Sequence, residues 1–310
     1  MKILLVVDGS SYSNVATRML EALHLPPRTE VTVMTVVPEH TFLGGITLRK
    51  LRGASVRKEA QQQKALELLQ DPVQTLGARK LRVESLVRWG NPAEEILRVG
   101  NESGTSLVVM GAKGLTDPLS FRLGSIAQTV MKHARASVLL VKGKATTTGA
   151  SSARDKGVAI KRVLLATDGS KYSDMVTQFL LDLPLPRRCE VIIVTALQSH
   201  LAALVRTPTL DFQTNQELLA RLQSAEESEA RKITAKSEKQ LQAKGYKTAS
   251  VVIRGGAAES ILAASKEYKP DVIALGSRGL SRIESLLLGS VVERVARYAD
   301  CSVLISRTRR

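Results

Sequence analysis

Short apolar runs alternate along the chain with longer segments in which apolar residues recur every three or four positions. Short apolar runs rich in β-branched residues are typical of strands, and the 3.6-residue period is typical of helices. In the first half, this pattern predicts helices at 11–24, 51–76, 93–102 and 125–135 and strands at 2–7, 31–37, 81–87, 106–110 and 137–142.

The second half follows the same order. Its predicted strands lie near 162–167, 190–196, 248–253, 271–275 and 301–306, with helices between them, including a long polar helix over 215–244. Strands as uniformly apolar as these are expected to be buried on both faces, as in a parallel sheet flanked by helices. With right-handed crossovers, the pattern predicts an α/β fold with two doubly wound, five-stranded parallel-sheet domains.

Internal similarity supports this division. Residues 3–10 recur at 163–170 with an offset of 160, and residues 90–97 recur at 255–262 with an offset of 165. The segment between the two copies is rich in Lys, Thr, Ser, Gly and Ala and shows no periodicity, which is typical of a flexible linker. We therefore predict one domain at 1–142, a linker at 143–158 and a second domain at 159–310.

Composition narrows the class of protein. The chain has 310 residues, which is enough for two cores, and 44% of them are hydrophobic. Its apolar runs are much shorter than a bilayer requires, and the first run ends at Asp8 without a signal-peptide pattern. These features predict a cytoplasmic protein without a membrane partner. The two cysteines, Cys189 and Cys301, show no metal-ligand spacing and are predicted to be buried packing residues.

The net charge of +16 is spread along the chain. Residues 1–142 carry 19 basic against 12 acidic residues, and residues 161–310 carry 23 against 16. A nucleic-acid-binding tail would concentrate the charge, so we expect no specific nucleic-acid partner, and only 3% of the residues are aromatic. A diffuse basic surface still attracts polyanions, including nucleotides.

The strongest candidate site is a glycine loop after the fourth predicted strand of each copy. Its pattern is Gly-x-x-Gly, nine further residues, and then Gly-Ser at the start of a helix, at Gly111, Gly114, Gly124 and Ser125 in the first copy and at Gly276, Gly279, Gly289 and Ser290 in the second. Glycines let a phosphate approach backbone amides, and the first amides of a helix attract anions. Glycines also commonly terminate strands and cap helices, so a purely structural role stays equally open for the loop alone.

Other side chains add to this candidate site. Lys113 and Arg278 place a positive charge inside each loop, and the two loop serines can cap the helix or donate a hydroxyl to phosphate. Asp8 and Asp168 follow the first strand of each copy. Because ligands of open α/β sheets bind beyond the carboxyl ends of the strands, these residues are expected at one site.

Together, the loop pattern and the aspartate after strand one resemble the ATP-binding signature of the universal stress protein family. The resemblance covers nearly the whole chain as a tandem pair of domains, and it implies the adenine nucleotide alpha hydrolase-like fold with strand order 3-2-1-4-5. It implies ATP, ADP or AMP as the ligand, with Asp8 and Asp168 facing the adenosine. Backbone groups of Val36 and Ala196 would bind the adenine. Ribose and phosphates would be held by Gly111, Gly114, Gly124, Ser125 and Ile126 in copy one, and by Gly276, Gly279, Gly289, Ser290 and Val291 in copy two.

The copies depart from the family pattern to different degrees. Copy one has Ala112 where a side-chain donor is common, and Pro118 restricts its loop, whereas copy two has Ser277 before Arg278. If only one pocket is occupied, we expect it to be the second. The resemblance also implies association through the fifth strand, either as a homodimer or as a pseudo-dimer within one chain.

The sequence thus predicts an adenine-nucleotide-binding protein of a stress or regulatory response, with no or very slow hydrolysis. Mg²⁺ can arrive with the nucleotide, because it needs few protein ligands beside phosphates. Two alternatives stay open: a weak ATPase or nucleotide-dependent enzyme, and a protein-interaction module with a vestigial pocket. A Walker motif and a Gly-x-Ser-x-Gly elbow are absent from the sequence. His40 and His200 are interpreted as solvated loop residues.

Overall fold

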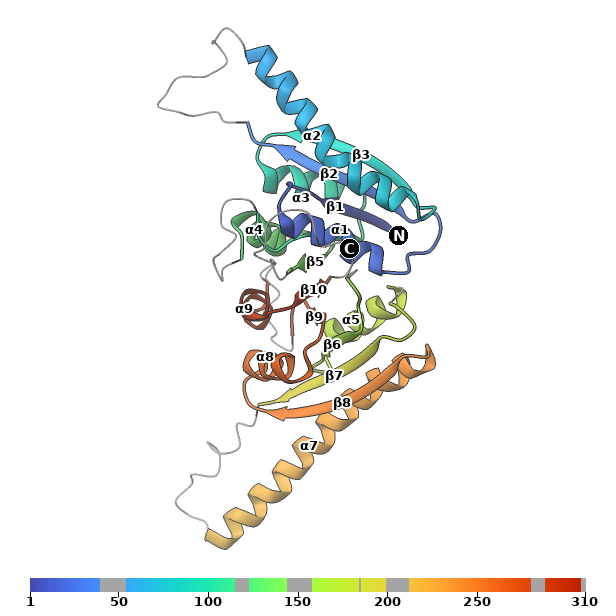
Figure 1. The fold of residues 1–310 in the computed structure, drawn as a ribbon. Coiled ribbons are helices and arrows are strands. Elements are labelled where there is room, and N and C mark those ends of the chain that lie inside the picture. Colours follow the sequence, from blue (N-terminus) through green and yellow to red (C-terminus); the bar gives the residue numbers. More distant parts are fainter. Residues whose placement is uncertain are drawn as a thin grey trace, which may run out of the picture. The chain divides into compact units, whose positions relative to one another are not determined.

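The computed structural model of the chain describes residues 1–39, 54–114, 123–143, 158–183, 185–198, 212–279 and 288–307. Its contacts divide into two compact units, Met1–Ala159 and Ile160–Arg307. Each unit is an α/β domain with its own core (Figure 1). His40, Pro118 and His200 lie outside the described residues.

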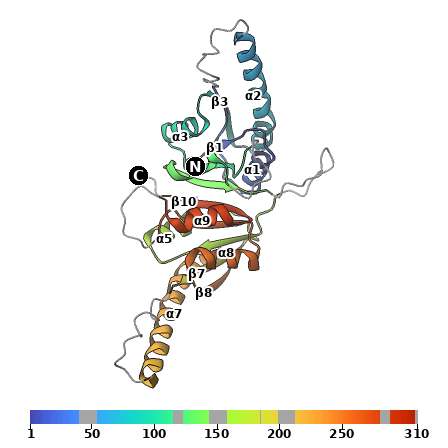
Figure 2. The ribbon, with the colours of Figure 1, turned by 90° about the vertical axis from the view of Figure 1, so that its left-hand side faces the viewer.

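In unit 1, strands and helices alternate along the chain. The elements are β1 (Lys2–Val6), α1 (Ser11–Ala22), β2 (Glu30–Val37), α2 (Ala54–Gly77), β3 (Arg82–Trp89), α3 (Pro92–Glu102), β4 (Leu107–Gly111), α4 (Ser125–His133) and β5 (Ser137–Val141). The described strands are all parallel and lie in the order β3-β2-β1-β4-β5. Helices α1 and α2 contact each other, and α3 contacts α4. In Figure 2, α3 lies on one side of β1 and β3, and α1 and α2 lie on the other.

Unit 2 repeats this arrangement. Its elements are β6 (Arg162–Ala166), α5 (Lys171–Asp182), β7 (Glu190–Leu197), α7 (Phe212–Ala243), β8 (Lys247–Arg254), α8 (Ala257–Tyr268), β9 (Val272–Gly276), α9 (Ser290–Tyr298) and β10 (Ser302–Ser306). Within the described part, the order is β8-β7-β6-β9-β10, which corresponds to 3-2-1-4-5. The predicted fold class is therefore confirmed for both copies.

The central strands follow the expected burial, and β3 and β8 do not. Every residue of β9 is buried, and in β1 only Lys2 is exposed. In contrast, β3 and β8 consist of exposed and half-buried residues, because each has a neighbouring strand on one side only among the described elements. The prediction that strands are buried on both faces is thus wrong for these two.

The predicted linker and the domain boundaries stay predictions, since most of 143–158 lies outside the described residues. No helix in the described ranges combines the length and apolar character that a membrane span requires. Cys189 is fully buried as expected, but Cys301 is only half-buried.

Candidate functional site

In each unit, the predicted site residues lie at the carboxyl edge of the sheet. In unit 1, Asp8 follows β1 and the glycine segment follows β4, and these two strands are direct neighbours. A Cβ atom added to Gly114 would lie 3.0 Å from Asp8 Oδ2, and one added to Gly279 would lie 2.7 Å from Asp168 Oδ2. The structure therefore brings each aspartate against the second glycine of its loop.

The aspartate is held by the turn that precedes the first helix. Asp8 Oδ1 accepts hydrogen bonds from the Ser10 amide at 3.0 Å and from the Ser10 hydroxyl at 2.6 Å. Gly9 between them has φ +79°, a left-handed conformation that glycine adopts without strain. In unit 2, Asp168 Oδ1 likewise accepts from the Ser170 amide at 3.0 Å, and Gly169 has φ +75°. This local turn orients the carboxylate toward the loop after the fourth strand.

The end of the second strand completes the same edge. The Val7 amide donates to Met34 O at 2.9 Å, and the Gly90 amide donates to Val37 O at 3.1 Å. Because backbone groups alternate sides along a strand, Val36 directs its N–H and C=O toward β1, at a point beyond the last residue of that strand. Ala196 is placed in the same way. The Val194 carbonyl accepts a hydrogen bond from the Thr167 amide, and the Leu197 carbonyl accepts one from the Gly255 amide. These backbone groups thus face the region of Asp8 and Asp168.

The three loop glycines are not equivalent. A Cβ on Gly111 would lie 2.8 Å from Tyr12 Cβ, and one on Gly276 would lie 3.0 Å from Tyr172 O, so both glycines allow a helix to approach the strand end. In contrast, a Cβ on Gly124 or Gly289 would meet no described atom closer than 3.5 Å, and neither residue has a positive φ. The described chain thus has room for a side chain at these two positions.

Gly124 and Gly289 are the N-cap residues of α4 and α9, and among the described residues no side chain makes the cap hydrogen bond of either helix. Ser10 and Asn91 cap α1 and α3 with their side chains. The expected capping by Ser125 and Ser290 is wrong, because each is the first residue inside its helix. The first amides of α4 and α9, including those of Ile126 and Val291, consequently lack partners within the helix and within a cap.

The loop cations lie over a tyrosine in the first turn of the neighbouring helix. Lys113 Nζ lies 5.7 Å from the centroid of the Tyr12 ring, and Arg278 Cζ lies 5.8 Å from that of Tyr172. Arg307, which we did not predict as a site residue, follows β10 and is half-buried. Burial and the neighbouring Arg278 guanidinium lower the pKa of Arg307 to about 10. In the sequence, the only indication of Arg307 is its position 165 residues after Lys142, which is the offset between the glycine loops of the two copies.

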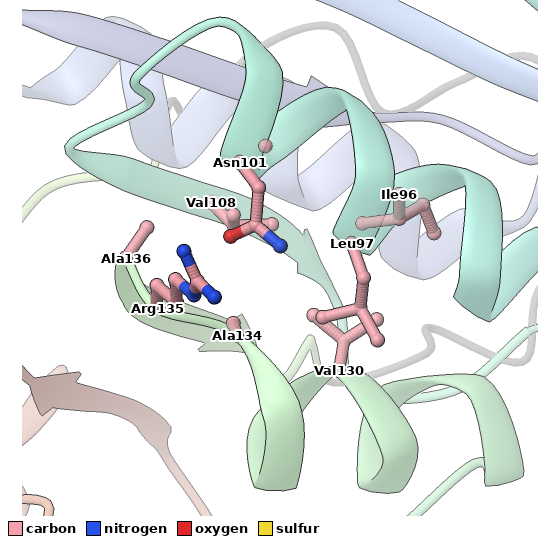
Figure 3. A pocket seen from close by; sticks show the side chains of 9 residues that line it. Ile96, Leu97, Asn101, Val108, Val130, Ala134, Arg135 and Ala136 are labelled. Atoms are coloured by element: carbon pink, nitrogen blue, oxygen red, sulfur yellow. The ribbon is translucent and has the colours of Figure 1, made fainter.

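A small pocket with about 10 Å³ of free space lies elsewhere in unit 1, between α3, α4 and the start of β4 (Figure 3). Apolar side chains such as Ile96, Val108 and Val130 form most of its lining, and Asn101 and Arg135 add polar groups. It is smaller than typical small-molecule sites. It lies beside the C-terminal ends of both helices, away from Gly111 and Asp8, and belongs to none of the predicted sites.

Comparisons with known proteins agree with two domains of the same α/β fold. The model of the universal stress protein family matches residues 1–142 and 159–307. A universal stress protein of Bacillus subtilis is 26% identical over 148 residues, covering 46% of this chain and 98% of that protein. One of Mycobacterium tuberculosis is 26% identical over 229 residues, covering 74% of this chain and 70% of the other. The crystal structure of a universal stress protein from Archaeoglobus fulgidus covers 100% of this chain and 98% of its own, with a TM-score of 0.61 and 20% identity.

Proposed function

The chain belongs to the universal stress protein family as a tandem pair of domains, and from this premise we propose that each unit binds one adenine nucleotide at the carboxyl edge of its sheet. The nucleotide is ATP, ADP or AMP, and hydrolysis is absent or very slow. The protein then acts as a nucleotide-dependent component of a stress or regulatory response. Most of the support comes from Gly124 and Gly289, which leave a helix N-terminus uncapped where the described chain has room for a side chain.

The phosphate side of the proposal rests on those helix ends. Unpaired amides in the first turn and the helix dipole favour an anion at the N-terminus of α4 and α9. Glycine at the cap keeps the approach to these amides free of a Cβ atom. Lys113 and Arg278 lie in the adjoining loops and contribute positive charge. A polyphosphate matches this combination better than a neutral ligand does.

The nucleoside side rests on Asp8, Asp168 and the backbone of Val36 and Ala196. A backbone N–H and C=O that point past the end of the neighbouring strand offer one donor and one acceptor, which is the pair that the edge of adenine requires. The carboxylate beside it accepts hydrogen bonds from ribose hydroxyls. One carboxylate per unit also suits a Mg²⁺ ion that is held mainly by phosphates and water.

The experiment that tests this proposal is calorimetric titration of the full chain with ATP in the presence of Mg²⁺. We expect two sites per chain, and one site after either Gly124→Asp or Gly289→Asp. Aspartate is a favoured N-cap residue, so both variants keep the helix, while the added charge repels phosphate. Gly124→Asn and Gly289→Asn are the matched controls for size without charge, and they should weaken binding less.

Two further readouts extend the test. Trp89 is the only tryptophan of the chain and ends β3 beside Val37, so its fluorescence should respond to ATP in the wild type and not in Gly124→Asp. Phosphate release measured on the same samples should stay near background. A folded wild type that binds no adenine nucleotide would refute the proposal and favour the interaction module. Turnover that collapses in Asp168→Ala would favour the ATPase instead.

A further inference from the structure

Two basic side chains of unit 2 lie over the ring of Tyr172 in the first turn of α5. Lys171 Nζ lies 5.2 Å from the centroid of the Tyr172 ring, and Arg278 Cζ lies 5.8 Å from it on the same ring. Arg278 Nη1 also lies 3.5 Å from the Tyr172 hydroxyl. The ring thus holds Arg278 at the α5 side of the segment between Gly276 and Gly279.

Arg307 adds a second guanidinium to this group. The Ser277 amide donates to Ser306 O at 3.0 Å, which places the residue after β10 directly beside Arg278. Burial, followed by the charge of the Arg278 guanidinium, lowers the pKa of Arg307. An anion that contacts both guanidinium groups is attracted by each of them.

Unit 1 has fewer charged side chains, and no guanidinium group, at the equivalent positions. Lys113 stands in place of Arg278, Lys142 in place of Arg307, and the uncharged Ser11 in place of Lys171. A guanidinium binds a phosphoryl group through two parallel hydrogen bonds, whereas an ammonium acts as a point charge. The two units therefore differ in both the charge and the geometry that they offer to phosphate.

We propose that Lys171, Arg278 and Arg307 form a subsite for the terminal phosphoryl group of the nucleotide in unit 2, so that this unit prefers a triphosphate over a monophosphate more strongly than unit 1 does. The inference rests on the proposed function, because it extends the nucleotide site of the same unit. Arg278 lies between Gly276 and Gly279, so the subsite adjoins the phosphate site proposed at the N-terminus of α9. The terminal phosphoryl group is recognised by its charge and its three oxygens, which suit paired guanidinium groups.

The test uses the full chain with the site of unit 1 blocked by Gly124→Asp. In this background, ATP and AMP are titrated into the parent and into Arg278→Gln and Arg307→Gln. We expect each substitution to weaken ATP binding about tenfold or more, the usual size of one lost charge-assisted contact, and to change AMP binding less than about twofold. Lys266→Gln is the matched control, because it removes the same charge from an exposed position in the last turn of α8.

A second probe separates this subsite from the nucleotide site. Inorganic tripolyphosphate should raise the thermal midpoint of the parent and not that of the Arg278→Gln/Arg307→Gln double variant, with far-UV circular dichroism confirming that both are folded. Stabilisation by tripolyphosphate without any nucleotide binding would retain the subsite and refute the proposed function. Equal losses for ATP and AMP, or unchanged ATP binding in folded Arg278→Gln and Arg307→Gln, would overturn the subsite.

Discussion

Glycine performs three different tasks within one short loop. Gly111 lets α1 approach the end of β4, Gly114 lets the Asp8 carboxylate lie against the backbone, and Gly124 leaves a helix end uncovered. Their spacing in the sequence predicts one phosphate-binding role for all three. The position of the neighbouring atoms separates the packing role of Gly111 from the open position of Gly124.

The close packing of Gly111 predicts that alanine lowers stability at this position and not at Gly77, another glycine of unit 1. Gly111→Ala should lower the free energy of unfolding by about 1–3 kcal/mol, because its Cβ would lie 3.0 Å from Lys113 O and 2.8 Å from Tyr12 Cβ. Gly77→Ala at the end of α2 is the control, since its Cβ meets nothing within 4 Å and alanine favours the helix. Urea unfolding followed by circular dichroism measures both. Equal midpoints for the two variants would contradict this interpretation.

The buried thiol of Cys189 predicts a pH dependence. Burial, followed by the charges of Asp271 and Glu190, raises its pKa from 9.0 to about 12. The unfolded chain therefore releases this proton first, so the contribution of Cys189 to stability is complete below about pH 9 and is lost as the pH rises toward 12.

The measurement is the urea midpoint between pH 8 and pH 10.5, with Cys189→Ala as the comparison. The wild type should lose up to about 1.4 kcal/mol of stability per pH unit more than the variant above pH 9. Parallel curves for the two proteins would exclude the effect. Thiol reagents should also modify Cys189 only after unfolding.

At the scale of elements, α7 is anchored along its second half. Ala230, Thr234, Ser237 and Leu241 are buried, and the Ser237 hydroxyl lies 3.2 Å from that of Thr177 in α5. Nearer the N-terminus, Leu218 is 40% exposed. The sequence showed a continuous helical period over 215–244, and the packing restricts burial to the part that covers β7 and β8.

Truncation of one leucine in each half should reveal this division. Leu241→Ala leaves a cavity under the helix and should cost about 2–4 kcal/mol, whereas Leu218→Ala should stay within about 0.5 kcal/mol of the wild type. Chemical denaturation measures both, and hydrogen exchange should show faster exchange near Leu218 than near Leu241. A large loss for Leu218→Ala would mean that this half of α7 is packed as well.

At the scale of the whole molecule, each unit contains a complete sheet and core. The two five-stranded orders are the same, and the buried central strands of each unit pair within that unit. The domain boundaries therefore lead to a fragment test. Residues 1–142 and 159–310, expressed separately, should each unfold cooperatively.

A shorter fragment serves as the control for this test. Residues 1–104 end before β4 and β5 and so lack two strands that are buried along most of their length. This fragment should show no cooperative transition in urea. If residues 1–142 failed to fold alone, we would conclude that the domain boundary lies elsewhere or that unit 1 requires unit 2 to fold.

Much of the fold was predictable because it depends on local regularities. The alternation of apolar runs and helical periods located the strands and helices, and the repeated Asp-Gly-Ser and glycine-loop segments indicated two equivalent domains. The spacing also predicts Asp8 and Gly114 as candidate site residues, which the sheet brings together since β1 and β4 are neighbours. The charged residues Arg82, Glu84 and Arg88 already distinguish β3 from the apolar strands, but which strand occupies the edge depends on strand pairing.

The sequence by itself determined the fold class, the duplication and the edge of the sheet where the candidate site lies, because periodicity and motif spacing are properties of the chain. Only the tertiary structure decided that Gly124 rather than Ser125 caps α4, that Gly111 serves packing, and that Arg307 joins Arg278. The contacts of Gly111 and Arg307 depend on atoms that are distant in sequence and that the fold brings together. The spacing of residues along the sequence does not indicate which of them are close in space.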